Sequence, residues 1–229
     1  MKKSLYIVVA LFVITMTAPV QAQKLYAGVL GGSNSADLDI KFADNTITDY
    51  EILSRTLFSA GGFIGVYFNK YLSVQLEPMF VAKGGVFRLR STQDLRIKSN
   101  QIELPLILKA EFGDMIKPFI LGGGFLSFVL DASIETEMAG KLWEGDLAKV
   151  LNSTELGVML GAGISIPLWQ GLLFAEGRYA LGLTNLNKGG YVNLSSGSLL
   201  AAGPQTNPND EINTIGIQIL IGYQLPIFR

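Results

Sequence analysis

Hydrophobic and polar residues alternate along most of the chain with a period of two. The regular stretches are 72–83, 101–112, 156–167, 173–184 and 215–225, and the less regular ones are 24–32, 58–68 and 118–130. A period of two is typical of β-strands that present one apolar and one polar face. The pattern therefore predicts eight strands of 9–13 residues.

Strand length and the connections between strands both favour a membrane barrel. Transmembrane β-strands need about 9–11 residues, whereas strands of soluble domains usually have about 5–6. The short connections are 69–71, 113–117 and 167–171, and the longer, more polar ones are 33–55, 85–98, 131–153 and 185–213. Short turns at one end and long loops at the other are typical of outer-membrane barrels. We therefore expect an all-β fold, an eight-stranded antiparallel up-and-down transmembrane β-barrel with both termini in the periplasm.

The uncharged stretch 156–175 is 20 residues long, so by length it would also suit a transmembrane helix. It contains four glycines and Pro167. In a helix interior these cost about 1 kcal/mol for each glycine and about 3 kcal/mol for the proline. A hairpin that turns at 167–171 also explains the alternation. Because a sheet in lipid must close to leave no unpaired edge, such a hairpin implies a barrel.

A soluble β-barrel or sandwich is an alternative with the same alternation. Its outward polar face should be rich in Lys, Glu, Asp and Thr. The polar face of this chain carries small residues instead, namely Gly157, Gly161, Gly163, Gly216 and Gly222. Small residues suit the crowded interior of an eight-stranded barrel. The opposite face, almost purely Leu, Ile, Val and Phe, suits lipid.

Charged residues on the polar face are expected in the lumen or at its rims. A buried charge costs several kcal/mol unless it is paired. We therefore expect a structural luminal ion-pair network of Glu77, Lys83, Glu103, Lys109, Glu176 and Arg178, with Glu111 and Glu155 on the same face. A proton or ion path is the functional alternative, although eight strands leave little room for a channel.

Aromatic residues gather near the expected short turns. Aromatic girdles mark the membrane interfaces of outer-membrane barrels. We expect one periplasmic girdle formed by Tyr67, Phe68, Tyr71, Phe112, Trp169, Tyr223 and Phe228.

The N-terminus has the layout of a secretory signal peptide. Lys2 and Lys3 precede the apolar run 5–14, and the small-residue pattern Val20-Gln21-Ala22 follows. Cleavage is expected between Ala22 and Gln23, which divides the chain into a signal peptide, 1–22, and a barrel domain, 23–229. An N-terminal membrane anchor is the alternative, but a ten-residue helix spans only about 15 Å of the ~30 Å hydrocarbon core.

Composition excludes several kinds of chemistry. The 229 residues are 49% hydrophobic and 16% charged, with a net charge of −1 and neither cysteine nor histidine. The chain therefore has no disulfide framework, no His-dependent catalysis and no His-ligated metal. A slightly acidic chain also lacks the basic footprint of nucleic-acid binding.

The longer connections hold three further features. The acidic residues Asp37, Asp39, Asp44, Asp49 and Glu51 match no ordered calcium loop, so we expect no metal and no cofactor. The apolar residues of 131–153 indicate either loop packing or a short amphipathic helix over the barrel mouth. The connection 185–213 is rich in Gly, Ser, Asn and Pro and is expected to be flexible.

Several segments resemble the PorT-like outer-membrane β-barrel family. They are 76–85 (LEPMFVAKGG), 101–109 (QIELPLILK), 117–124 (KPFILGGG), 160–164 (LGAGI) and 175–184 (AEGRYALGLT). The resemblance implies an eight-stranded barrel, similar to the OmpA and OmpX barrels, in the outer membrane of a diderm, Gram-negative-type bacterium. It also implies a link to protein secretion, the process in which the namesake takes part. The chain departs from many outer-membrane barrels at its end, where Arg229 follows Phe228.

Together these features predict a non-enzymatic barrel with a structural or interaction role in the envelope. An accessory component of an outer-membrane secretion or assembly system is the alternative. An outer-membrane enzyme is the third class, but barrel hydrolases, proteases and acyltransferases use a histidine. The expected partners are outer-membrane lipid, the barrel-assembly machinery and a protein at the extracellular loops, without nucleic acid.

Overall fold

The computed structural model describes residues 24–41, 50–89, 93–207 and 209–227. These form one sheet of β1 (Lys24–Lys41), β2 (Tyr50–Tyr67), β3 (Leu72–Leu76), β4 (Met79–Leu89), β5 (Gln93–Glu111), β6 (Lys117–Met138), β7 (Lys141–Asp146), β8 (Thr154–Leu168), β9 (Gly171–Gly182), β10 (Gly190–Ser196), β11 (Leu199–Thr206) and β12 (Glu211–Pro226). Within these ranges no helix is long and apolar enough to cross a membrane.

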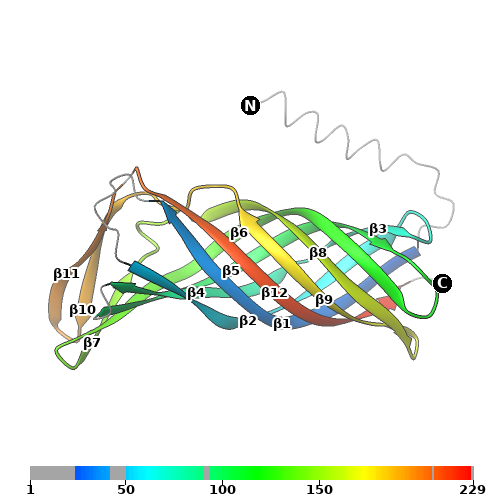
Figure 1. Ribbon diagram of the computed structural model, residues 1–229, viewed down its shortest axis with the longest axis horizontal. Coiled ribbons are helices and arrows are strands. Elements are labelled where there is room, and N and C mark those ends of the chain that lie inside the picture. The colour runs from blue at the N-terminus through cyan, green and yellow to red at the C-terminus, as the bar shows by residue number, and fades with distance from the viewer. Residues whose placement is uncertain (1–23, 42–49, 90–92, 208, 228–229) are drawn as a thin grey trace.

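The sheet closes on itself as a barrel (Figure 1). Going round it, β6 pairs with β8, then come β9, β12, β1, β2, the β3–β4 position and β5, which pairs again with β6. All these pairings are antiparallel, and the first strand pairs with the last. The predicted eight-stranded antiparallel up-and-down transmembrane barrel is therefore confirmed.

Strands β3 and β4 together occupy one of the eight positions. They are interrupted only at Glu77 and Pro78, and their register against β2 and β5 is the same on both sides of the interruption. The Glu77 amide donates to the Pro105 carbonyl at 3.0 Å, and the Gly62 amide donates to the Pro78 carbonyl at 3.2 Å. Because proline has no amide hydrogen, the interruption falls where a ladder bond cannot form.

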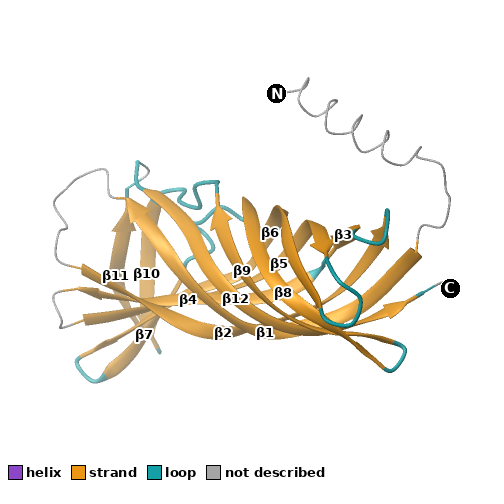
Figure 2. Cartoon of the chain, turned by 45° about the vertical axis from the view of Figure 1, so that its right-hand side comes forward, coloured by secondary structure: helices purple, strands orange, loops and turns teal. Residues whose placement is uncertain are grey.

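The two ends of the barrel differ in the length of their connections. The turns after β2, β5 and β8 lie at the same end as the start of β1 and the C-terminus, and we call this the short-turn end (Figure 2). The opposite end, which carries β7, β10 and β11, is called the long-hairpin end (Figure 1).

Strands at the long-hairpin end are longer than predicted. β1 and β2 each have 18 residues, β5 has 19 and β6 has 22. The prediction that 33–55, 85–98, 131–153 and 185–213 are loops was therefore wrong for most of their length. Polar residues on both faces hide the alternation, but backbone pairing between neighbouring strands continues beyond the lipid-facing band.

The connection 131–153 forms a hairpin instead of an amphipathic helix. β6 turns at Ala139-Gly140, both at positive φ, and β7 pairs back onto it. Two residues at positive φ match the twist of a tight β-hairpin. Leu147 and Val150 after β7 are buried against Val192 of β10, so the loop-packing alternative is confirmed. The stretch 185–213 likewise contains the β10–β11 hairpin, where flexible chain was expected.

The lumen is filled by an apolar cluster. Its members are Tyr26, Leu30, Phe63, Met79, Val81, Ile107, Phe119, Leu121, Phe125, Met159, Phe174, Ala180 and Leu220. In five pairs an aromatic ring lies beside a glycine on the neighbouring strand: Tyr26–Gly65, Phe63–Gly28, Phe119–Gly163, Phe125–Gly157 and Phe174–Gly222. A Cβ on any of these glycines would overlap the paired ring. The luminal glycines therefore make room for large rings in a narrow barrel.

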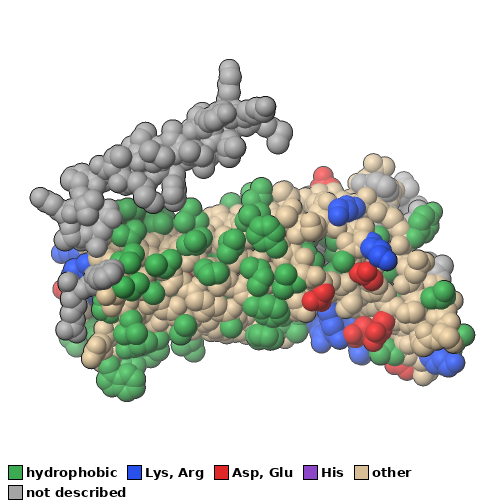
Figure 3. Space-filling view, turned by 180° about the vertical axis from the view of Figure 1, so that it is seen from behind, with side chains coloured by type: hydrophobic (Ala, Val, Ile, Leu, Met, Phe, Trp, Pro, Cys, Tyr) green, Lys and Arg blue, Asp and Glu red, His purple; other side chains and the backbone are tan. Residues whose placement is uncertain are grey.

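The outer surface carries an apolar band. Outward-facing residues of the alternation are exposed, including Val29, Ile64, Leu108, Ile120, Leu160 and Ile219. Figure 3 shows hydrophobic side chains over the barrel wall, with acidic and basic side chains gathered at the long-hairpin end on this face. An apolar band of this kind is the surface that a transmembrane barrel presents to lipid.

Candidate functional site

The middle of the lumen holds an ion-pair cluster around Arg178. Its guanidinium makes two bonds to Glu77, from Nη1 to Oε2 at 2.5 Å and from Nη2 to Oε1 at 2.9 Å. Nη2 also lies 2.5 Å from Glu176 Oε1, and the three side chains are at most 1% exposed. Gln75 donates a further hydrogen bond to Glu77. This bidentate arrangement uses the planar fork of arginine.

A second charged cluster has Lys83 at its centre. Lys83 Nζ lies 2.7 Å from Glu103 Oε1 and 3.2 Å from Glu155 Oε2. Thr214 donates a hydrogen bond to the other oxygen of Glu155. One ammonium therefore joins carboxylates from two strands, β5 and β8.

A third cluster lies toward the short-turn end. Lys109 Nζ lies 2.8 Å from Glu111 Oε1 and 3.9 Å from the centre of the Phe119 ring. The Tyr67 hydroxyl donates to Glu111 Oε2 at 2.7 Å, and Gln224 Nε2 donates to the Tyr67 hydroxyl at 3.1 Å. The ion pair, the cation–π contact and the two hydrogen bonds together satisfy the charged and polar groups of this cluster.

The structure places all eight charged residues of the polar face inside the barrel, each less than 9% exposed. It divides them among three separate clusters: Arg178 with Glu77 and Glu176, Lys83 with Glu103 and Glu155, and Lys109 with Glu111. Alternation cannot predict this division, because it assigns each residue to a face of its strand but gives neither its position along the barrel axis nor its position around that axis.

Uncharged polar residues complete the clusters, and sequence reasoning did not single them out. Gln75 and Thr214 bond to luminal carboxylates, and Ser127 donates to Gln101 at 2.7 Å. Their signal is present in the sequence, because each lies on the same alternating face as the charged residues.

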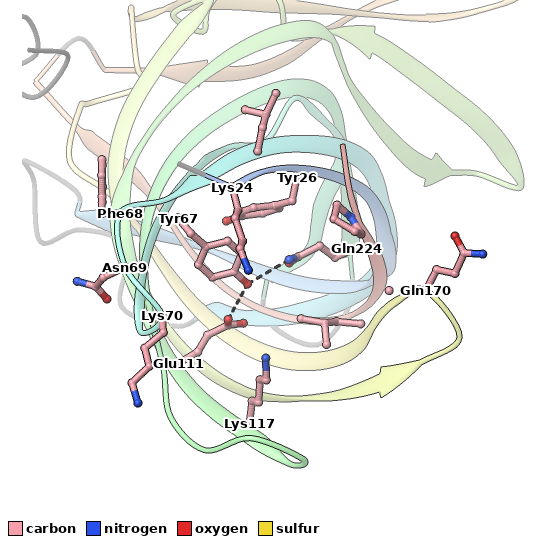
Figure 4. A pocket seen from close by; sticks show the side chains of 14 residues that line it. Lys24, Tyr26, Tyr67, Phe68, Asn69, Lys70, Glu111, Lys117, Gln170 and Gln224 are labelled. Atoms are coloured by element: carbon pink, nitrogen blue, oxygen red, sulfur yellow. Dashed lines mark hydrogen bonds between the residues drawn. The ribbon is translucent and has the colours of Figure 1, made fainter. Parts of the chain in front are cut away.

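Tyr67 is not part of an aromatic girdle, so that assignment was wrong. Its ring packs on Tyr26 with the centres 4.8 Å apart, and its hydroxyl bonds to Glu111 inside the lumen (Figure 4). The reason is register. Tyr67 lies two residues after Gly65 and therefore on the same face of β2, and the residue paired with Gly65 is the luminal Tyr26.

The other proposed girdle residues are placed as follows. Phe68, Tyr71 and Phe112 are exposed at the short-turn end, and Trp169 in the β8–β9 turn is 91% exposed. Tyr223 is half-buried, and its hydroxyl donates to the Leu168 carbonyl at 2.9 Å. Phe228, Ala22 and Gln23 lie outside the described residues.

The sequence of this chain matches a known protein family. The sequence model of the family described as outer membrane protein beta-barrel domain matches residues 21–188. The chain belongs to this outer membrane β-barrel family. Its barrel therefore lies in the outer membrane of Gram-negative bacteria. Because such barrels usually have their short turns on the periplasmic side, we expect the short-turn end to face the periplasm.

Several solved outer membrane proteins are similar to this chain. The outer membrane protein OprG from Pseudomonas aeruginosa is 12% identical, with a TM-score of 0.53 over 89% of this chain and 97% of that chain. AlkL, determined in lipid bilayers, is 11% identical over 93% and 97%, with a TM-score of 0.48. The outer membrane protease OmpT from Escherichia coli is 8% identical over 91% and 99%, with a TM-score of 0.43. Of these three, OprG has the TM-score that supports a shared fold. No curated protein matches the sequence.

Among the residues that the structure describes, there is no group of three or more acidic side chains placed to hold a metal ion. The side chains of Asp37 and Asp39 in the acidic connection lie outside that description. The luminal carboxylates face basic or hydrogen-bonding partners, which suits stabilisation of the barrel interior.

Proposed function

We propose that this protein is a non-enzymatic integral outer-membrane barrel with a structural and interaction role, and that its lumen does not conduct. The closed lumen carries the proposal, because aromatic side chains and three charged clusters fill the described interior. The lack of histidine supports a non-enzymatic role. The ion-pair clusters are then structural, and they stabilise the packed interior rather than move protons or ions.

Planar-bilayer recording tests the closed lumen. The purified barrel should insert without discrete conductance steps, whereas a known porin in the same bilayer should give them. Insertion is checked by heat-modifiability, since a folded barrel migrates anomalously on a gel until it is boiled. Reproducible unit conductance, abolished by boiling before reconstitution, would contradict the proposal.

A protein partner at the long-hairpin end is the interaction we propose. β7, β10 and β11 project beyond the barrel as a small sheet with a buried cluster of its own (Figures 1 and 2). Tyr191, Leu199 and Leu200 are exposed on it, at 72%, 47% and 80%. Exposed apolar side chains of this kind favour contact with another surface. Charged substitutions at Tyr191 and Leu200 should abolish cross-linking to the partner while the barrel still folds.

Outer-membrane lipid and the barrel-assembly machinery are the other proposed partners. Exposed Trp169 at the short-turn end supports an interfacial aromatic girdle. In a Trp143→Phe variant, Trp169 is the one remaining tryptophan of the two in the chain. Its fluorescence should be quenched by lipids brominated near the headgroup and not by lipids brominated at the bilayer centre. The opposite depth profile would remove Trp169 from the interface.

A PorT-like role as an accessory component of protein secretion is the second candidate. The ordered family-like segments, such as 101–109 and 117–124, and the projecting sheet at the long-hairpin end support it. A strain lacking the gene should lose specific secreted proteins, and the wild-type gene should restore them. An unchanged secretome would leave the structural role as the better account.

A further inference from the structure

A cavity of about 510 Å³ opens into the barrel at the short-turn end (Figure 4). Residues from β1, β2, β5, β6, β9 and β12 and from the turns after β2 and β8 line it. Its floor is the hydrogen-bonded group of Gln224, Tyr67 and Glu111. Pockets of about 300–1,000 Å³ are typical of small-molecule sites, so the volume suits a small ligand or one lipid headgroup.

Two lysines that enter this cavity have no carboxylate of their own. Figure 4 shows the ammonium groups of Lys24 and Lys117 directed into the cavity, whereas Lys70 points away from it. Within the described part of the chain, neither Lys24 nor Lys117 forms an ion pair. Glu111, the one acidic residue among the described residues of the lining, is already engaged by Lys109 and Tyr67. The opening of this cavity, which we call the mouth, therefore carries the two positive charges of Lys24 and Lys117. Below them, the charge of Glu111 is already compensated by Lys109.

Register explains why these lysines face inward. Lys24 lies two residues before the luminal Tyr26, and Lys117 lies two residues before the luminal Phe119. Residues two apart in a strand share a face. Lysines that reach toward lipid headgroups from the outer wall keep their stems on the apolar surface. Lys24 and Lys117 are on the opposite face, so contact with surrounding headgroups does not explain their position.

We propose that this periplasmic mouth is a binding site for a phosphate group. Two ammonium groups match the charge of about −1.5 to −2 that a phosphate monoester carries at neutral pH. Charge-assisted hydrogen bonds from lysine to phosphate are short and strong, and the side-chain amide of Gln224 points into the same cavity (Figure 4). The phosphate belongs either to a soluble periplasmic molecule or to the headgroup of a lipid in the inner leaflet.

Isothermal titration calorimetry of the purified barrel with inorganic phosphate tests this site. In maltoside detergent, which carries no phosphate, the wild-type protein should bind phosphate saturably. The double variant K24Q/K117Q should bind at least tenfold more weakly, because each lysine supplies a charge-assisted contact. K141Q is the matched control, since it removes the same charge from β7 at the other end of the barrel, and it should bind like the wild type.

A second arm distinguishes the two sources of phosphate. In phosphatidylglycerol nanodiscs, weakened binding of inorganic phosphate indicates that a headgroup occupies the mouth, and unchanged binding indicates a soluble ligand. Heat-modifiability checks that K24Q/K117Q folds. If it does not, the single variants K24Q and K117Q are each expected to bind about threefold more weakly. The proposal is overturned if wild-type protein binds no phosphate saturably, or if folded lysine variants bind as tightly as K141Q.

Discussion

Replacing Arg178 with alanine should destabilise the barrel more than any comparable change at its ends. Arg178 makes bonds of 2.5 and 2.9 Å to Glu77 and lies 2.5 Å from Glu176. All three side chains are at most 1% exposed. Alanine would leave two carboxylates buried near each other without a cation, and burial of uncompensated charge is costly.

The expected magnitude follows from that burial. Removing one partner of a buried ion pair costs about 3–5 kcal/mol. With a urea dependence of about 1–3 kcal/mol per molar, the unfolding midpoint should fall by at least about 1 M. Arg88→Ala is the matched control, because Arg88 also pairs with a carboxylate, Asp94 at 2.7 Å, but the two side chains are 35% and 38% exposed. A solvent-exposed ion pair contributes little to stability, so this midpoint should hardly move.

The assay is unfolding in a urea series, with the folded fraction read from heat-modifiability in lipid vesicles. A third variant, E77Q/E176Q/R178M, removes the whole charged group at similar volume. It should recover most of the stability lost in R178A, since a neutral replacement of a buried cluster is often tolerated. Equal unfolding midpoints for R178A and R88A would refute the reasoning. If the triple variant is as unstable as R178A, the stability lost in R178A comes from side-chain packing rather than from uncompensated charge.

Three further predictions concern other parts of the barrel. Gly157→Val should lower stability by about 1–3 kcal/mol through overlap with the Phe125 ring, and a second change, Phe125→Ala, should restore part of it in a thermal melt. The hydrogen bond from Arg88 lowers the pKa of Asp94. The Arg88–Asp94 pair therefore stabilises the β4–β5 hairpin at pH values above the ordinary carboxyl pKa of about 4, and this stabilisation is lost as the pH falls below that value and Asp94 is protonated. Hydrogen exchange of that hairpin should accelerate in acid, and D94N should remove the dependence. Leu194→Asp should expose β10 and β11 to protease without abolishing heat-modifiability, because Leu194 is buried in the separate cluster at the long-hairpin end. If β10 and β11 stay resistant to protease, this cluster is not independent of the luminal cluster.

The luminal site was predictable only in part. The identity of the inward face follows from alternation, so Glu103, Lys109 and Arg178 could be assigned to the lumen from their positions alone. Their partners could not be assigned, because Glu77 and Arg178 are 101 residues apart and meet only through barrel closure and strand stagger. The mouth cavity is a similar case, since Lys24 and Lys117 begin strands that are not neighbours.

Alternation by itself determined the number of barrel positions, the lipid-facing side and the short turns, because a strand in lipid must satisfy a period of two with an apolar outer face. It could not determine where strands end beyond the membrane, since water accepts polar residues on both sides of a sheet. Nearness to a short turn misassigned Tyr67 to the aromatic girdle, although its ring and hydroxyl lie in the lumen. Only the tertiary structure decided the aromatic–glycine pairs, the three charged clusters and the positive mouth, because each depends on the register between strands rather than on order within one strand.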